Sequence, residues 1–371
     1  MLNGKQYCRR CISFKGEEVE HITSYPKKAP IHLEYELSPE QKELSNKLVE
    51  NYKKGIDSLV FAVCGSGKTE ICLAIIQSCL NEGKTVGFAA PRRTVCFELG
   101  ARFRNFFKNN KVTVVCGGHH RTLNGDIVCL TTHQLFRYHQ YFDLLIMDEI
   151  DAFPYKDNKT LHQFFTNAVR GQHILLTATP SDSLIKEYSK QGKDVLRLSS
   201  RFHRHPLPVP KIETGYFLKL YYKLYINMRR FLKNNKQIII FVPTIDYSKK
   251  IAFFLKLFFF KGTYVNSKRK DEEKVIDDFR KKKYMYLVST AVLERGVTIK
   301  DVQVIIFHAD HNIYDSASLI QISGRVGRKK DAPEGEVIFI AKTNTQQMQR
   351  AVAEIKSANK ALQNMLQRIQ N

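Results

Sequence analysis

Short apolar runs rich in β-branched residues recur along this chain and alternate with segments of helical periodicity. A first series comprises Ser58–Val63, Thr85–Ala90, Val112–Cys116, Ile127–Thr131, Leu144–Met147 and Ile174–Thr177. A second series comprises Gln237–Val242, Met285–Ser289, Val302–Phe307 and Glu336–Ile340. Strands that are apolar on both faces and interleaved with helices are typical of parallel sheets covered on both sides. The pattern predicts an α/β protein with two mainly parallel sheets.

The break between the two series is rich in proline. Arg201–Pro210 holds three prolines in five positions, which disfavour both helices and strand ladders, so this stretch is expected to be an extended linker. The apolar stretch Ile251–Phe260 is about half as long as a membrane span and contains Lys256, so it predicts a buried helix. The expected parts are an N-terminal extension (1–35), a first domain (36–200), a linker (201–212), a second domain (213–345) and a C-terminal amphipathic helix (346–371).

Composition adds a strong charge imbalance to this picture. The 371 residues are 43% hydrophobic, which indicates a globular chain long enough for two cores. Lys and Arg number 59 against 36 Asp and Glu, a formal net charge of +23. This excess favours a polyanionic partner, with nucleic acid preferred over an anionic membrane surface. Met1–Tyr7 shows no secretory signal, and most cysteines lack paired spacing, as expected for reduced thiols in a cytosolic protein.

A glycine-rich loop, Cys64-Gly-Ser-Gly-Lys-Thr69, follows the first predicted strand and precedes a helical pattern. Gly65 and Gly67 allow a tight turn that brings backbone N–H groups, including that of Ser66, onto phosphate oxygens. Lys68 is placed to reach the β- and γ-phosphates, and the Thr69 hydroxyl to ligate Mg²⁺. Ala62 stands where the common motif has its first glycine, and an ordinary glycine turn is the alternative interpretation. The flanking strand and helix favour an ATP site.

An acidic cluster follows the strand Asp143–Met147, at the edge where open α/β sheets bind ligands. Asp148 is expected to hold Mg²⁺, and Glu149 to orient or deprotonate the attacking water. An acidic helix cap is the alternative.

A glycine-arginine segment, Gln321–Arg328, lies in the second series. Its spacing suggests that Arg325 and Arg328 act on a nucleotide held by the first domain, where arginine fingers contribute about 10³–10⁵ in rate. The alternative is that these arginines pair with surface acids.

Together these elements resemble superfamily 2 helicases and translocases, from roughly Leu37 to Ile340. The resemblance implies two RecA-like domains that sandwich ATP and close on it. It implies an adenine contact for Gln41, further nucleotide-site roles for Cys64, Gly296 and Gln321, and coupling of ATP to nucleic acid by Thr177 and Thr179. It implies contacts to the nucleic-acid backbone by Arg92, Thr131, Thr244 and Thr290, at an edge opposite to the nucleotide in both domains. Basic runs such as Lys268–Lys270 and Lys281–Lys283 would assist.

Three stretches resemble the ComFA family of late competence proteins within that superfamily: Ala62–Glu70, Asp148–Tyr155 and Tyr7–Cys11. The resemblance implies an ATP-driven motor for single-stranded DNA that acts during natural transformation. It also implies a cytoplasmic location at the inner face of the cell membrane, with a ComFC-like protein and the DNA-uptake channel as partners.

One feature departs from the family, which has a four-cysteine zinc module before the motor. Only the second pair, Cys8 and Cys11, is present here. A closed structural zinc site needs four ligands, and His21 and His32 lack finger spacing. Either the start of the module is missing or the pair is vestigial, so zinc binding by this chain alone is not expected.

Two rival functions remain at this point. An RNA-dependent ATPase of the DEAD-box type would share Asp151, but Gln321 stands where that group has histidine. An ATP-gated clamp would hold DNA without stepping along it. Lys68, Glu149 and both arginines favour catalysis. No base-reading element is found, so little sequence preference is expected.

Overall fold

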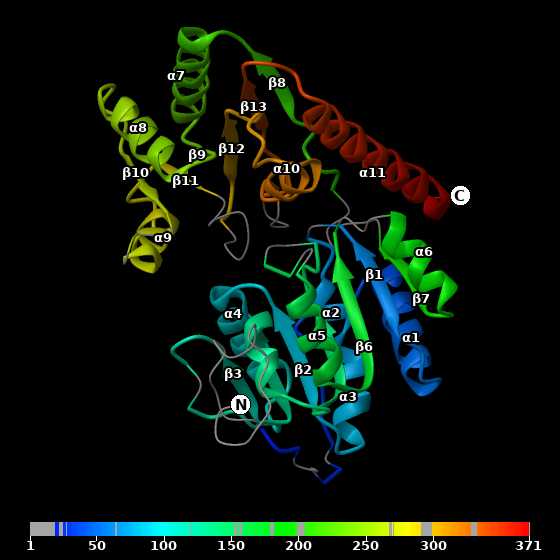
Figure 1. Ribbon diagram of the computed structural model, residues 1–371. Helices are drawn as coiled ribbons and strands as arrows, with labels where there is room; N and C mark the ends of the chain where they lie inside the picture. Colours follow the sequence, from blue (N-terminus) through cyan, green and yellow to red (C-terminus); the bar gives the residue numbers. More distant parts are fainter. Residues whose placement is uncertain are drawn as a thin grey trace. The chain divides into compact units, whose positions relative to one another are not determined.

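The computed structural model describes residues 19–21, 25–26, 28–63, 65–119, 121–151, 154–155, 158–178, 182–198, 205–266, 269, 271–290, 299–327 and 332–370. The chain divides into two compact units, Met1–Leu198 and Ser199–Asn371. Each unit is an α/β layer structure around one sheet (Figure 1). Among the described residues, no helix combines the length and the apolar character needed to cross a membrane.

The first unit is built on a seven-stranded parallel sheet in the order β3-β4-β2-β5-β6-β1-β7. Its strands are β1 (Ser58–Ala62), β2 (Val86–Ala90), β3 (Val112–Val115), β4 (Ile127–Thr131), β5 (Phe142–Met147), β6 (Val169–Thr177) and β7 (Asp194–Leu198). β2 and β4 are buried at every position, because helices cover both faces.

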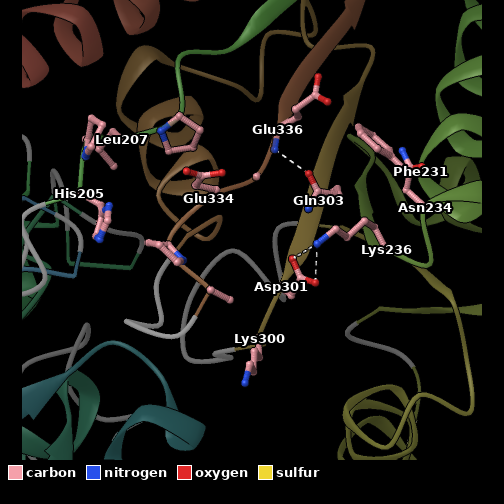
Figure 2. A pocket seen from close by; sticks show the side chains of 15 residues that line it. His205, Leu207, Phe231, Asn234, Lys236, Lys300, Asp301, Gln303, Glu334 and Glu336 are labelled. Atoms are coloured by element: carbon pink, nitrogen blue, oxygen red, sulfur yellow. Dashed lines mark hydrogen bonds and ion pairs between the residues drawn. The ribbon is translucent and has the colours of Figure 1, made fainter.

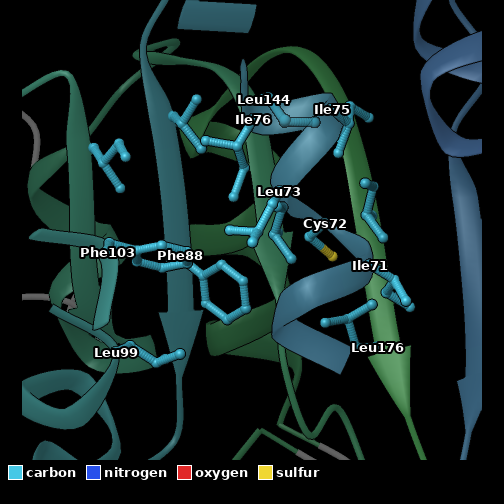
Figure 3. Close-up of a cluster of buried hydrophobic side chains, with 14 of the residues drawn as sticks. Ile71, Cys72, Leu73, Ile75, Ile76, Phe88, Leu99, Phe103, Leu144 and Leu176 are labelled. Atoms are coloured by element: carbon cyan, nitrogen blue, oxygen red, sulfur yellow. The ribbon is translucent and has the colours of Figure 1, made fainter. Parts of the chain in front are cut away.

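One face of this sheet packs against α1 (Pro39–Lys53), α2 (Lys68–Ile71), α3 (Leu73–Asn81) and α4 (Arg93–Phe106). Figure 3 shows part of this core, where Phe88 of β2 lies beside Phe103 of α4 with ring centroids 5.4 Å apart. The other face packs against the 3₁₀ helix η1 (Thr132–Arg137), α5 (Lys159–Ala168) and α6 (Asp182–Lys190).

The second unit has a six-stranded parallel sheet in the order β10-β11-β9-β12-β13-β8. Its strands are β8 (Lys211–Thr214), β9 (Gln237–Phe241), β10 (Gly262–Val265), β11 (Tyr286–Ser289), β12 (Val302–Phe307) and β13 (Val337–Ala341). One face packs against α7 (Phe217–Lys233) and α8 (Ile245–Lys256). The other packs against α9 (Glu272–Arg280), α10 (Ser316–Ser323) and α11 (Gln346–Gln370).

The predicted fold class is confirmed, since both units carry parallel sheets between helices and α11 forms the C-terminal helix. Three strands were not predicted: β7, β8 and β10. Each is an outermost strand of its sheet and is only partly buried, so it lacks a continuous apolar run. β8 begins at Lys211, so it contains the last two residues of the stretch expected to be linker.

The prediction that Ile251–Phe260 is a buried helix is wrong for the outward-facing half of this stretch. α8 ends at Lys256, and only one side of it, including Ile251 and Leu255, is buried. Phe253 is 67% exposed, and Phe259 is 97% exposed in a turn with φ of 59°. A helix of this length turns some of its residues away from the sheet, so a continuous apolar run does not reveal which of its side chains are buried.

Candidate nucleotide and nucleic-acid sites

The glycine-rich loop connects β1 to α2 in the first unit. Gly65 and Gly67 both have φ of 81°, in the left-handed region that favours glycine. Gly67 also forms the N-cap of α2, and a Cβ atom there would lie 2.4 Å from Nε2 of Gln41. The backbone conformation therefore favours glycine at position 67, and a Cβ atom there would also have to displace the Gln41 amide. Cys64, predicted to belong to the same loop, lies outside the described residues.

Gln41 braces this loop against the start of α1. Its Oε1 accepts the N–H of Ser38 at 2.8 Å, and Ser38 caps the helix in return, which makes a capping box. Its Nε2 donates to the carbonyl oxygen of Ser66 at 2.7 Å. Both ends of the amide are thus engaged within the protein. The adenine contact of Gln41 stays a prediction.

The loop presents a polar atom without a protein partner. Ser66 is fully buried, and among the described residues its Oγ makes no hydrogen bond. A buried hydroxyl without a partner is costly. A phosphate oxygen in the loop would satisfy this hydroxyl, so the residues fit the nucleotide that the sequence predicts.

The acidic cluster lies at the carboxyl end of β5. Asp148 is half-buried and its Oδ1 accepts the N–H of Glu149 at 2.9 Å. Glu149 has φ of 55°, a strained conformation for a residue other than glycine. Burial, helped by the negative charges of Glu149 and Asp151, raises the pKa of Asp148 to about 6, although the charge of Lys68 opposes the shift. A divalent cation would relieve this excess of negative charge, so Asp148 and Thr69 fit the predicted Mg²⁺ site.

Thr177 contacts the acidic cluster directly. It ends β6, the neighbour of β5, and its buried Oγ1 donates to Oδ1 of Asp151 at 2.9 Å. The residue expected to couple ATP and nucleic acid is therefore in contact with Asp151, three residues after Asp148. Thr179 lies outside the described residues.

The nucleic-acid candidates of the first unit lie at the same sheet edge as the glycine-rich loop. Arg92 is the N-cap residue of α4, directly after β2, and Thr131 ends β4 opposite Ala90. Thr131 is only 6% exposed. The expectation of an edge opposite to the nucleotide is wrong for this unit. In a parallel sheet every strand-to-helix loop emerges at the carboxyl edge, so the two sets of residues share that edge.

The nucleic-acid candidates of the second unit also follow neighbouring strands. Thr244 is the N-cap of α8 and accepts the N–H of Tyr247 at 3.3 Å. Thr290 follows β11, is 8% exposed, and comes after Ser289, which pairs with Phe241 of β9. Within the basic runs, three residues form ion pairs with nearby acids: Arg269 with Asp271, Lys281 with Asp277, and Lys283 with Asp278. Lys268 and Lys270 lie outside the described residues.

The glycine-arginine segment reaches the other edge of the second sheet. Gln321 is 5% exposed in α10, and Arg325 is half-buried just beyond the helix. A Cβ atom on Gly335, which leads into β13, would lie 2.5 Å from Val326 and 3.2 Å from Gln303 at the start of β12. The segment therefore lies beside the amino ends of the strands. Arg328 and Gly296 lie outside the described residues, as do Cys8 and Cys11.

A cavity of about 820 Å³ opens at this amino edge (Figure 2). The Nζ atom of Lys236 lies 2.7 Å from both carboxylate oxygens of Asp301 on its wall. Gln303 accepts the N–H of Glu336 there at 2.6 Å. The lining carries both signs of charge and includes none of the predicted site residues.

Sequence reasoning missed two features of the first unit. Gly117 and Gly118 form a turn after β3, next to the strand that ends at Thr131. Two backbone hydrogen bonds between Cys116 and His119 hold the turn, and among the described residues the space beside both glycines is empty of protein atoms. The sequence signal for this turn is a glycine pair that follows an apolar run. Arg102 of α4 reaches Thr69 and Glu70 of α2, and no local pattern indicates a contact between residues so far apart in sequence.

Two family models match the chain. The model for the type III restriction enzyme res subunit matches residues 34–182, and the model for the helicase conserved C-terminal domain matches residues 220–330. Among solved structures, S. cerevisiae Dbp5 bound to RNA and ADP BeF3 resembles the chain with a TM-score of 0.63 and 17% identity, covering 87% of this chain and 92% of that one. At this identity the likeness shows the fold alone.

Two curated relatives match almost the whole chain. Competence protein ComFA of Streptococcus pneumoniae is 35% identical over 376 residues, which cover 96% of this chain and 86% of the relative. Competence protein ComFA of Bacillus subtilis is 32% identical over 378 residues, covering 96% and 81%. The helicase models and these relatives show a nucleic-acid-dependent ATPase with a role in competence. The chain belongs to the ComFA family of superfamily 2 helicases.

Proposed function

We propose that this protein uses ATP hydrolysis to move along single-stranded DNA during natural competence. The observation that carries the proposal is the gathering of Lys68, Asp148 and Thr177 at one sheet edge with Arg92 and Thr131. The net charge of +23 supports a polyanionic track. A ComFC-like protein and the DNA-uptake channel at the inner face of the membrane are the proposed partners.

In the proposed mechanism Lys68 would hold the β- and γ-phosphates, and Thr69 and Asp148 would hold Mg²⁺. The cation, when bound, neutralises charge on the phosphates. Glu149 orients the attacking water and accepts its proton. Arg325 and Arg328, contributed by the second unit, stabilise charge on the transferred phosphoryl group. ATP then favours closure of the two units and hydrolysis releases it.

The test is ATP hydrolysis by the full chain with no nucleic acid, with oligo(dT) and with oligo(U), across a salt series. We expect the strongest stimulation by oligo(dT), weakening steeply as salt rises, because contacts to phosphates release counterions. Stronger stimulation by oligo(U) would favour the RNA-dependent ATPase instead. Equal hydrolysis in all three conditions would contradict both.

A further inference from the structure

Arg102 links α4 to the two residues that follow Lys68. Its Nη1 lies 3.4 Å from the hydroxyl oxygen of Thr69, and its Nη2 forms an ion pair with Oε1 of Glu70. The hydroxyl of Tyr35 donates to the same carboxylate oxygen at 2.6 Å. The Glu70 side chain is 9% exposed and that of Arg102 is 32% exposed, so the pair is shielded on one side and open on the other.

The helix that carries Arg102 begins at a nucleic-acid candidate. Arg92 is its N-cap, and Arg102 lies ten residues further, about 15 Å along the axis at 1.5 Å per residue. Cys96, Leu99 and Phe103 of α4 are buried in the core beneath the sheet. A packed helix moves as one body, so a shift at its N-terminus would also displace Arg102.

The contact of Arg102 with Thr69 would compete with Mg²⁺ for the same hydroxyl oxygen. The Thr69 hydroxyl is the group proposed to ligate Mg²⁺, and a guanidinium donating to that oxygen would repel a divalent cation. Arg102 must therefore loosen its contact with Thr69 when Mg²⁺ and nucleotide bind. The ion pair with Glu70 keeps the Arg102 side chain near Thr69 both with and without Mg²⁺.

We propose that Arg102 is a positioning residue that couples nucleic acid at the start of α4 to Mg²⁺-nucleotide binding at Thr69. The inference rests on the proposed function of Arg92 and Thr69. Nucleic acid shifts α4 and moves Arg102 away from the Thr69 hydroxyl, which raises the affinity of the site for Mg²⁺ and nucleotide. By linkage, nucleotide binding then tightens the hold on nucleic acid by the same factor.

The experiment measures equilibrium binding of a fluorescent ADP to the full chain, with and without saturating oligo(dT), in Mg²⁺ and in EDTA. In the parent protein we expect oligo(dT) to tighten binding about 5- to 150-fold in Mg²⁺, the usual range of coupling, and much less in EDTA. In Arg102→Ala the factor should fall below about twofold in Mg²⁺, while ADP still binds. The reciprocal titration, oligo(dT) binding with and without ADP, should lose the same factor.

Two further variants control the interpretation. Arg104→Ala removes an exposed arginine of the same helix whose one hydrogen bond among the described residues is a 3.4 Å contact to Val112, and it should keep the parent coupling. Arg102→Lys retains the charge for Glu70 but not the fork that also reaches Thr69, so its coupling factor should lie between those of the parent and Arg102→Ala.

Full coupling in Arg102→Ala, or in Arg102→Lys if the alanine variant does not fold, would overturn the inference. Absence of any Mg²⁺-dependent coupling in the parent would do the same. These outcomes differ from failure of the proposed function, in which the parent protein would neither bind oligo(dT) nor hydrolyse ATP faster in its presence.

Discussion

The two units use the same sheet architecture and distribute their candidate residues differently. The first unit gathers Lys68, Asp148, Arg92 and Thr131 at the carboxyl edge of its sheet. The second unit has Thr244 and Thr290 at the carboxyl edge, whereas the segment with Arg325 lies beside the amino ends. The candidate residues of the first unit therefore share one edge of its sheet, whereas those of the second unit lie at both edges.

The largest expected effect is a loss of ATP turnover on replacing arginines of the second unit. Arg328→Ala or Arg325→Ala should lower ATP turnover about 10³-fold or more, because stabilisation of the phosphoryl group is lost. ADP affinity should stay within about threefold, since Lys68 and its loop belong to the first unit. Stopped-flow hydrolysis and ADP titration separate the two quantities. Unchanged hydrolysis in both variants would contradict the predicted role of Arg325 and Arg328 in ATP hydrolysis.

The part of the first sheet away from these candidate residues should govern stability instead of turnover. His173 lies beside Asp57, with Nδ1 3.1 Å from its Oδ1, and near the hydroxyl of Tyr188. Burial lowers the pKa of His173 to about 4 and outweighs the charge of Asp57. Between pH 6.5 and 4 the unfolded chain thus binds more protons than the folded one, so stability is lost as pH falls through that window, by about 3 kcal/mol.

Urea unfolding of the first unit between pH 7 and 4.5 tests this dependence. His173→Gln should be less stable at pH 7 and should show a shallower loss of stability on acidification. ADP binding at pH 7 should be retained in the variant. An identical pH slope in parent and variant would show that other groups cause the acid sensitivity.

The glycine-rich loop offers a smaller effect with two separable causes. Gly67→Ala should weaken ADP binding by about 1–3 kcal/mol, because alanine is strained at φ of 81° and its Cβ would meet Gln41. The double variant with Gln41→Ala frees the space but not the backbone, so it should recover only part of the loss. Full recovery would mean that strain at Gly67 is unimportant.

The smallest effect concerns the contact between Thr177 and Asp151. Thr177→Val keeps the shape and removes the buried hydroxyl that donates to the half-buried Asp151 carboxylate, which costs about 1–3 kcal/mol. DNA-stimulated hydrolysis should fall roughly tenfold with basal hydrolysis little changed. Thr177→Ser should restore stimulation. Equal loss in the serine variant would point to packing and not to the hydrogen bond.

Sequence predicted the central strands well and missed three of the four outermost strands described, β7, β8 and β10. β2 and β12 are apolar throughout because helices cover both of their faces, whereas β8 and β10 are partly open and carry polar or glycine residues. The glycine-rich loop and acidic cluster were predictable because local spacing carries their chemistry. The contacts of Gln41 with Ser66 and of Arg102 with Glu70 were not, because these partners lie 25 and 32 residues apart in the sequence.

The most direct test of the account is ATP-dependent displacement of streptavidin from end-biotinylated oligo(dT) by the full chain. The account predicts displacement from one end, dependent on hydrolysable ATP and lost in Arg328→Ala. Hydrolysis stimulated by DNA with no displacement from either end would contradict translocation and favour an ATP-gated clamp.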